Sequence, residues 1–293
     1  ISPPAVHPPS STAVSTAVIP TQFVMGNTIT GASQNNLNTI CTAHLTNGFF
    51  GDFVVRWSIP RIILARERYM DSFNLVPLLL DDMQYVIPNI HGAKAKLLFD
   101  VFSKHCGSKI NNNSNRAKTV DGLSLLSGIT MNIGHAQLLD RLKFVFVLYD
   151  FDGTHQLNLS ELTMMVRTTV GGMAALAELP CPGIEDLHRI AKHIFTAADT
   201  DHSQTISLDE FICWATADRA ANWFFQTHQK TLDAQISLIQ TNPNTYGNTD
   251  LSSFEDAEKQ LLEQGSNVLD LKNHYLGDDG KLLVVAVAVV DVV

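Results

Sequence analysis

Two stretches of twelve residues carry oxygen-bearing groups at the same spacing. The first runs from Asp150 to Glu161 and the second from Asp199 to Glu210. A hard cation such as Ca²⁺ binds about six to eight oxygen atoms, and a twelve-residue loop can supply them from positions 1, 3, 5, 7 and 9, with both oxygens of a carboxylate at position 12. Both stretches fit this scheme, so the spacing predicts two calcium-binding loops.

The expected ligands are side chains at five positions of each loop and the backbone carbonyl at position 7. In the first loop they are Asp150, Asp152, Thr154, Gln156 through its carbonyl, Asn158 directly or through water, and Glu161. In the second loop they are Asp199, Asp201, Ser203, Thr205 through its carbonyl, Ser207 and Glu210. Leu157 and Ile206 at position 8 are expected to join the loops through a short two-stranded bridge. The predicted cofactor is therefore Ca²⁺, with up to two ions.

Apolar residues at helical spacing flank both loops. They precede the first loop at Leu138, Leu142 and Phe146 and follow it at Leu162 and Met165. The second loop is flanked in the same way, by Ile184, Leu187, Ile190, Ile194 and Phe195 before it and by Phe211, Ile212, Trp214 and Ala215 after it. The pattern predicts helix, loop and helix, twice over.

Position 6 departs from the usual loop pattern. The sharp turn there needs a positive φ, which favours glycine, but the two loops carry His155 and Gln204. A side chain in the left-handed region costs on the order of 1 kcal/mol. Each loop also offers only three carboxylates for the ion, because Asp209 at position 11 is expected to point away. We therefore expect affinities of roughly micromolar or weaker, or loops that keep their shape without metal.

With their flanking helices, both loops resemble EF-hands. The run from Leu142 to Gly153 is similar to the third hand of the neuronal calcium sensor and calcineurin-B group, and the wide connector containing Pro180 and Pro182 is similar to that group's link between its third and fourth hands. The resemblance covers about residues 55–225. It implies an all-α fold of paired EF-hands, with two more hands upstream.

The two upstream hands are expected to be degenerate. In the second hand, Val120 takes position 8, an Asn-rich insertion lengthens the loop, and Ser124 stands where the bidentate Glu belongs. The first hand has a shortened loop near residues 71–76, after which Pro77 is expected at the first position of a helix. Neither loop has a carboxylate set, so neither is expected to bind calcium.

These expectations divide the chain into four parts. They are an uncharged extended tail at 1–51, a degenerate EF-hand pair at 55–132, a calcium-competent pair at 136–225, and C-terminal helices with an apolar terminal strip at 226–293. Residues 1–51 contain no Asp, Glu, Lys or Arg and suit a linker or disordered tail. The strip at 281–293 is too short to span a bilayer, so no membrane span is predicted.

Four aromatic residues are candidates for partner binding, although packing within the protein is the competing interpretation. They are Trp214, Trp223, Phe224 and Phe225. A net charge of −9 argues against a nucleic-acid partner. The four scattered cysteines suit a reducing cytoplasm. No phosphate-binding glycine loop, nucleophile elbow or metalloprotease helix is found, so the protein is not expected to be an enzyme.

Two functional hypotheses follow. In the first, the protein is an adaptor or structural subunit of a larger assembly, bound to other proteins. The segments around Gly122 and Glu210 are similar to those of EF-hand proteins of cilia and flagella, which implies tubulin or axonemal proteins as partners and the axoneme as a location. In the second, the protein is a free calcium sensor that opens an apolar groove for a target helix. The tails discriminate between the two, because only the first hypothesis needs them.

Overall fold

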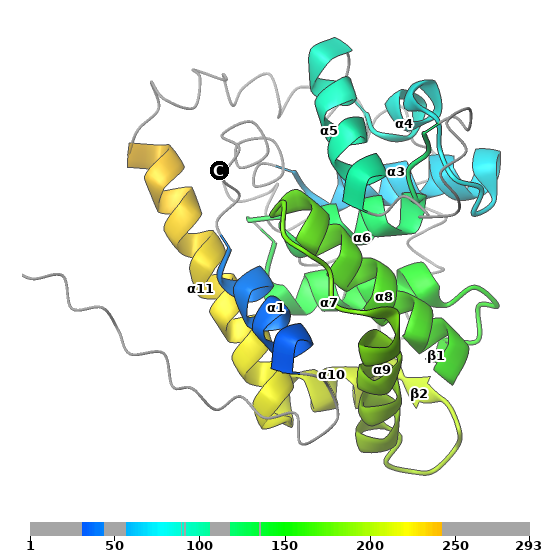
Figure 1. The fold of residues 1–293 in the computed structure, drawn as a ribbon. Helices are drawn as coiled ribbons and strands as arrows, with labels where there is room; N and C mark the ends of the chain where they lie inside the picture. Colours follow the sequence, from blue (N-terminus) through cyan, green and yellow to red (C-terminus); the bar gives the residue numbers. More distant parts are fainter. Residues whose placement is uncertain are drawn as a thin grey trace, which may run out of the picture.

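Helices dominate the part of the chain that the structure describes. This computed structural model describes residues 31–43, 57–88, 90, 92–105, 118–134 and 136–241, which form ten helices and one two-stranded sheet (Figure 1). The helices are α1 (Gly31–Thr42), α3 (Ile59–Phe73), α4 (Leu80–Val86), α5 (Gly92–His105), α6 (Gly122–Met131), α7 (Leu138–Tyr149), α8 (Leu159–Leu176), α9 (Ile184–Ala198), α10 (Leu208–Ala217) and α11 (Arg219–Thr241). The predicted all-α class is confirmed.

Local sequence explains where the helices after each loop begin. Asn158 caps α8 and Ser207 caps α10, and in both cases a Glu three residues later completes a capping box. In the upstream hand, the carboxylate of Asp121 accepts hydrogen bonds from the backbone N–H groups of Leu123 and Ser124 and so caps α6. These caps fix the exit direction of the chain from each loop.

Short antiparallel bridges join the loops in pairs. The strands β1 (Gln156–Leu157) and β2 (Ile206–Ser207) pair with Leu157 opposite Ile206, and both of these side chains are fully buried. The prediction for position 8 is confirmed.

The upstream pair has a matching bridge between Leu78 and Val120, with N···O distances of 2.8 and 2.9 Å. The prediction that Pro77 starts a helix is wrong. Its neighbour Leu78 is held extended by the bridge, so α4 begins only at Leu80.

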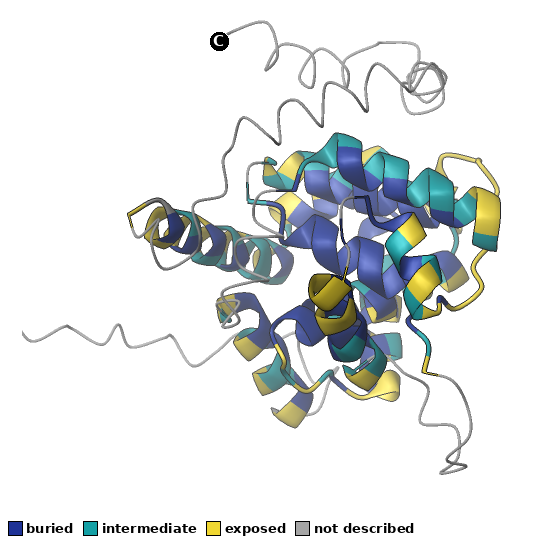
Figure 2. Cartoon of the chain, turned by 90° about the horizontal axis from the view of Figure 1, so that it is seen from above, coloured by how far each residue is buried: buried dark blue, intermediate teal, exposed yellow. Residues whose placement is uncertain are grey.

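The most extensive contact between described helices joins α6 and α8, which lie at the centre of the molecule. Figure 2 shows buried residues concentrated on the inner faces of the central helices and exposed residues on the periphery. At the crossing, glycines let the two backbones approach. A Cβ atom on Gly172 would lie 2.1 Å from the carbonyl oxygen of Ser124, and one on Gly128 would lie 2.7 Å from the backbone of Gly172. Helix α6 therefore packs directly on α8, the helix that follows the first predicted calcium loop.

The uncharged N-terminal stretch differs from the expected extended tail, because residues 31–42 form α1. Leu37, Ile40 and Cys41 are buried, and α1 packs mainly against α11 (Figure 1). Helix α11 also runs without a break through residue 226, where the sequence suggested a boundary. Residues 1–30 and 44–56, the Asn-rich insertion and the apolar strip at 281–293 lie outside the described residues.

Candidate metal centre

The second loop brings three carboxylates together. Oxygen atoms of Asp199, Asp201 and Glu210 all lie within 4.8 Å of one another, and within the described residues this is the single group of three His, Cys, Asp or Glu side chains that could hold a metal ion. Asp199 closes α9, whereas Glu210 lies in the first turn of α10. The loop between the two helices thus folds the first and last predicted ligands onto each other.

Backbone N–H groups hold these carboxylates in place. The N–H of Ser203 donates to Asp199 and to Asp201, with N···O distances of 2.9 Å in both cases, and the N–H of Gln204 donates to the other oxygen of Asp199 at 3.2 Å. Both the N–H and the hydroxyl of Thr200 donate to Glu210 at 3.0 Å. Thr200, at position 2 of the loop, therefore orients the carboxylate of Glu210 at position 12. The sequence analysis missed this role of Thr200.

The first loop repeats this framework with a looser set of carboxylates. The N–H groups of Thr154 and His155 donate to the two oxygens of Asp150 at 3.0 Å, and the N–H of Phe151 donates to Glu161 at 3.3 Å. The carboxylates of Asp150, Asp152 and Glu161 do not all approach within the 4.8 Å seen in the second loop. Each predicted ligand lies in its loop. The three carboxylates of the second loop lie closer together than those of the first.

The side chains at position 9 also cap helices, a role that was not expected. The side-chain oxygen of Asn158 accepts hydrogen bonds from the N–H groups of Ser160 and Glu161, at 2.9 and 3.1 Å. The hydroxyl of Ser207 donates to Glu210 at 2.8 Å. Both side chains therefore cap helices. The position 12 carboxylate accepts a hydrogen bond from the backbone N–H of Asn158 in the first loop, and from the N–H and hydroxyl of Ser207 in the second. The role of both side chains as metal ligands stays a prediction.

Hydrogen bonds stabilise the charged form of Glu210. Burial acts to raise the pKa of this carboxyl, but the bonds from Ser207 and Thr200 outweigh it and lower the pKa to about 2. In the first loop, hydrogen bonds from Thr154 lower the pKa of Asp152. Both groups are therefore anionic at neutral pH, as cation binding requires.

Both loops contain left-handed residues at positions 4 and 6. His155 and Gln204 at position 6 have φ of 59° and 69°, as expected. Position 4 was not foreseen. It is Gly153 in the first loop and His202, with φ of 59°, in the second. The second loop thus holds two side chains in a region that favours glycine.

Replacing Gln204 with glycine is expected to stabilise the protein by about 0.5 to 1 kcal/mol, because glycine adopts φ of 69° without steric cost. Urea unfolding in EDTA measures this directly. Gly153→Ala, at φ of 68°, is the opposite test and should destabilise the protein. A loss of stability in Gln204→Gly would contradict the strain argument.

A side-chain hydrogen bond connects the two loops. The hydroxyl of Thr205 donates to the side-chain oxygen of Gln156 at 2.6 Å. Both residues stand at position 7, whose backbone carbonyl is a predicted ligand, so this bond and the β1–β2 bridge tie the two candidate sites together.

The family comparison agrees with this geometry. Residues 139–216 match an EF-hand domain pair. The match spans the two loops and their four helices, and it supports an EF-hand calcium-binding protein. The similarity to the neuronal calcium sensor group and to ciliary proteins stays a prediction. No curated protein matches the chain.

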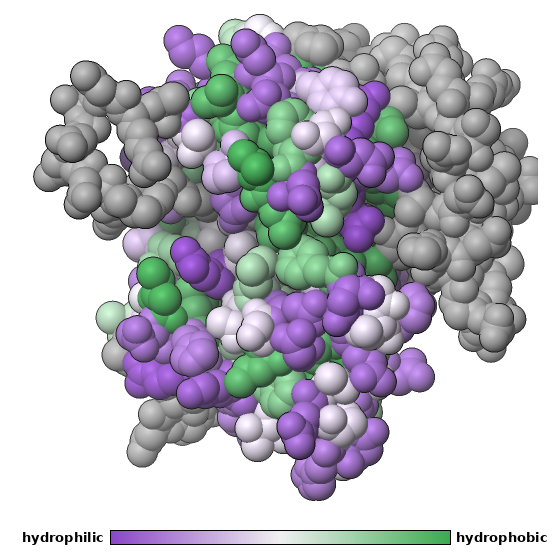
Figure 3. All heavy atoms as spheres, turned by 90° about the vertical axis from the view of Figure 1, so that its right-hand side faces the viewer, coloured by the Kyte–Doolittle hydropathy of each residue, from purple (hydrophilic) through white to green (hydrophobic). Residues whose placement is uncertain are grey.

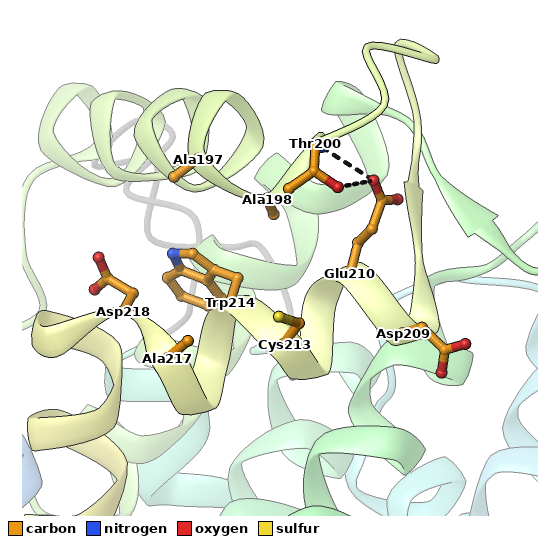
Figure 4. Close-up of a pocket in the computed structure, with 9 residues that line it drawn as sticks. All are labelled: Ala197, Ala198, Thr200, Asp209, Glu210, Cys213, Trp214, Ala217 and Asp218. Carbon is orange, nitrogen blue, oxygen red and sulfur yellow. Dashed lines mark hydrogen bonds between the residues drawn. The ribbon is translucent and has the colours of Figure 1, made fainter.

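A hollow of about 510 Å³ opens between α9 and α10 of the EF-hand pair. Figure 4 shows Trp214 lying between the two helices, Glu210 turned towards Thr200, and Asp209 pointing away from Glu210. Trp214 is 8% exposed and packs against Phe211, with ring centroids 5.9 Å apart. This candidate partner-binding residue is therefore both a core residue and part of the wall of the hollow.

The other three aromatic candidates lie on α11, after the EF-hand pair. Phe224 and Phe225 pack against the core, and their rings meet edge to face with centroids 5.5 Å apart. Trp223 lines a separate surface hollow together with Arg219 and Lys230. The structure does not bring the four aromatic residues into one patch, which favours packing as the role of the two phenylalanines.

Apolar and hydrophilic residues are mixed on the face that Figure 3 shows. Apolar residues run along its middle, and the lower end is mostly hydrophilic. Large exposed apolar side chains on and just before α4 include Val76, Leu79 and Tyr85. In the part of the chain that the structure describes, no helix has the length and apolarity needed to cross a membrane.

Proposed function

We propose that this protein binds calcium through its EF-hand pair and that the second loop is the stronger site. The observation that carries this proposal is the convergence of Asp199, Asp201 and Glu210 within 4.8 Å. Three carboxylates held at this spacing repel one another, and a divalent cation relieves that repulsion. The donor set is all oxygen, as a hard cation requires.

The ion in the second loop would be held by Asp199, Asp201, Ser203, the carbonyl of Thr205 and both oxygens of Glu210. Ser207 would contribute through water, because its hydroxyl is engaged with Glu210. The corresponding residues of the first loop would hold a second, weaker ion. When bound, Ca²⁺ supplies positive charge that links the end of α9 to the start of α10.

Calorimetric titration of the full chain with Ca²⁺ tests this proposal. We expect two binding events, and we expect Glu210→Gln to weaken the tighter one at least about tenfold, because a bidentate ligand loses its charge. Glu161→Gln should affect the weaker event. Asp209→Asn removes an equal charge from a carboxylate that points away from Glu210 (Figure 4), so it should leave both events nearly unchanged. Absence of any binding in the wild-type protein would overturn the proposal.

We further propose a non-enzymatic, protein-binding role, as an adaptor or structural subunit. The contact of α6 with α8 at Gly128 and Gly172 supports this role, because the exit helix of the third hand cannot swing outward without breaking it. A cytoplasmic location with tubulin or axonemal partners remains a proposal based on resemblance alone.

The hollow beside Trp214 favours the second candidate, a free sensor. It lies between the entering and exiting helices of the fourth hand, which is where a calcium-dependent opening would enlarge an apolar surface. Binding of an apolar dye before and after Ca²⁺ addition separates the two roles. A large increase supports the sensor, whereas an unchanged signal supports the adaptor.

A further inference from the structure

Helix α1 depends on its neighbours to be helical. Its sequence contains three Asn, two Thr and no charged residue, and its first and last turns carry no acidic or basic side chain that would favour the helix dipole. At 12 residues it is also about as short as an isolated helix can be in water. The surface that α1 contacts therefore supplies most of its stability.

That surface is formed by residues far away in the sequence. Near the start of α1, the hydroxyl of Ser33 donates to the carboxylate of Asp186 on α9. At its end, the hydroxyl of Thr231 on α11 donates to the carbonyl of Cys41, with an O···O distance of 3.3 Å. Helix α8 also contacts α1. The two ends of α1 are thus held by different helices.

The buried side chains of α1 form one stripe. Ser33, Leu37, Ile40 and Cys41 are each at most 5% exposed. Their spacing of four, three and one residues places them on a single face of the helix. On the opposite face Asn35, Thr39 and Thr42 are exposed. This pattern is how an amphipathic peptide helix occupies a groove of a partner.

We propose that the surface of α8, α9 and α11 beneath α1 is a docking surface for an amphipathic helix of a partner protein, and that α1 occupies this surface until the partner helix displaces it. The partner helix would carry an uncharged apolar stripe at the spacing of Leu37, Ile40 and Cys41. One turn earlier it would carry a hydroxyl or amide that donates to Asp186. Because α1 is rich in poor helix formers, a partner with stronger helix propensity competes effectively.

This proposal names the partner chemistry for the protein-binding part of the proposed function and does not require calcium. Asp186 lies on α9, the helix that ends at the predicted ligand Asp199. The experiment is therefore run both in EDTA and in Ca²⁺. Loss of calcium binding alone would overturn the metal site and leave the docking surface in place.

Alkylation of Cys41 reports displacement of α1. This thiol is fully buried, and burial raises its pKa to about 12, whereas Cys213 on α10 is exposed and serves as the internal reference. A synthetic peptide of residues 31–43 with Cys41→Ser is added to the full chain, and both cysteines are followed by mass spectrometry. We expect saturating peptide to raise the alkylation rate of Cys41 at least about tenfold and to leave Cys213 unchanged.

Matched controls identify the face involved. A peptide with Leu37→Asp and Ile40→Asp should have no effect, whereas one with Thr39→Asp, on the exposed face, should act like the parent peptide. In the full chain, Leu37→Asp should speed alkylation of Cys41 without any peptide and should bind labelled peptide more tightly than the wild type does. Circular dichroism verifies that this variant is folded.

Two results would overturn the proposal. One is an alkylation rate of Cys41 that stays unchanged even when the peptide is in large excess over the protein. The other is failure of the labelled peptide to bind the folded Leu37→Asp chain. Either result would make α1 a fixed part of the fold.

Discussion

Replacing Gly172 with alanine is expected to destabilise the protein by about 3 kcal/mol or more. The added Cβ atom would lie 2.1 Å from the carbonyl oxygen of Ser124 and 2.8 Å from the Cα atom of Gly128. Both are backbone atoms of α6, so no side-chain rotation can relieve the overlap, and the two central helices must separate. The better helix propensity of alanine, about 1 kcal/mol, is too small to compensate.

Urea unfolding followed by circular dichroism measures this loss. Gly183→Ala is the matched control, because its Cβ atom would meet nothing closer than 3.9 Å. We expect this control to change the free energy of unfolding by less than about 1 kcal/mol. Equal effects at the two positions would show that α6 and α8 are not closely packed at Gly172.

The sequence predicts the metal loops well because their information is local. Six ligand positions, the left-handed position 6 and the bridge at position 8 all lie within twelve consecutive residues, so the spacing alone identifies them. At position 9 the sequence analysis missed the capping role, because residue type alone does not show that Asn158 and Ser207 also accept hydrogen bonds from the first turn of the next helix. Their predicted role as metal ligands stays a prediction.

Helix α1 and the α6–α8 crossing could not be predicted, since both depend on distant residues. An uncharged segment rich in Asn and Thr is typical of a linker. The packing of its buried face on α8 and α11 and its hydrogen bonds with Asp186 and Thr231 stabilise it as a helix. Likewise, Gly128 and Gly172 look like weak points within helices until the structure brings them together. The elements that are hardest to predict are those that connect the hands to one another.

The buried polar cluster beneath α11 has the same long-range character and leads to a pH dependence. The carbonyl oxygen of Met131 at the end of α6 accepts a hydrogen bond from Arg141 on α7 at 2.5 Å and lies 3.0 Å from Nε2 of His228 on α11. His228 is 2% exposed. Burial, together with the adjacent Arg141 guanidinium, lowers the pKa of His228 to about 4. In the folded protein this imidazole is neutral.

Acidification from pH 7.5 to pH 5 is therefore expected to cost about 2 kcal/mol of stability through His228 alone. An exposed histidine of the unfolded chain has a pKa of about 6.5, so the unfolded chain binds more protons than the folded one in this range. The contribution is fully present above that pKa and is lost as pH falls through it towards about 4. Urea unfolding in EDTA at several pH values gives the slope of the free energy of unfolding against pH. His228→Gln cannot take up the proton and should remove most of this slope, while the effects of the carboxylates remain in both proteins. Identical slopes for the two would show that His228 does not control the acid sensitivity of α11.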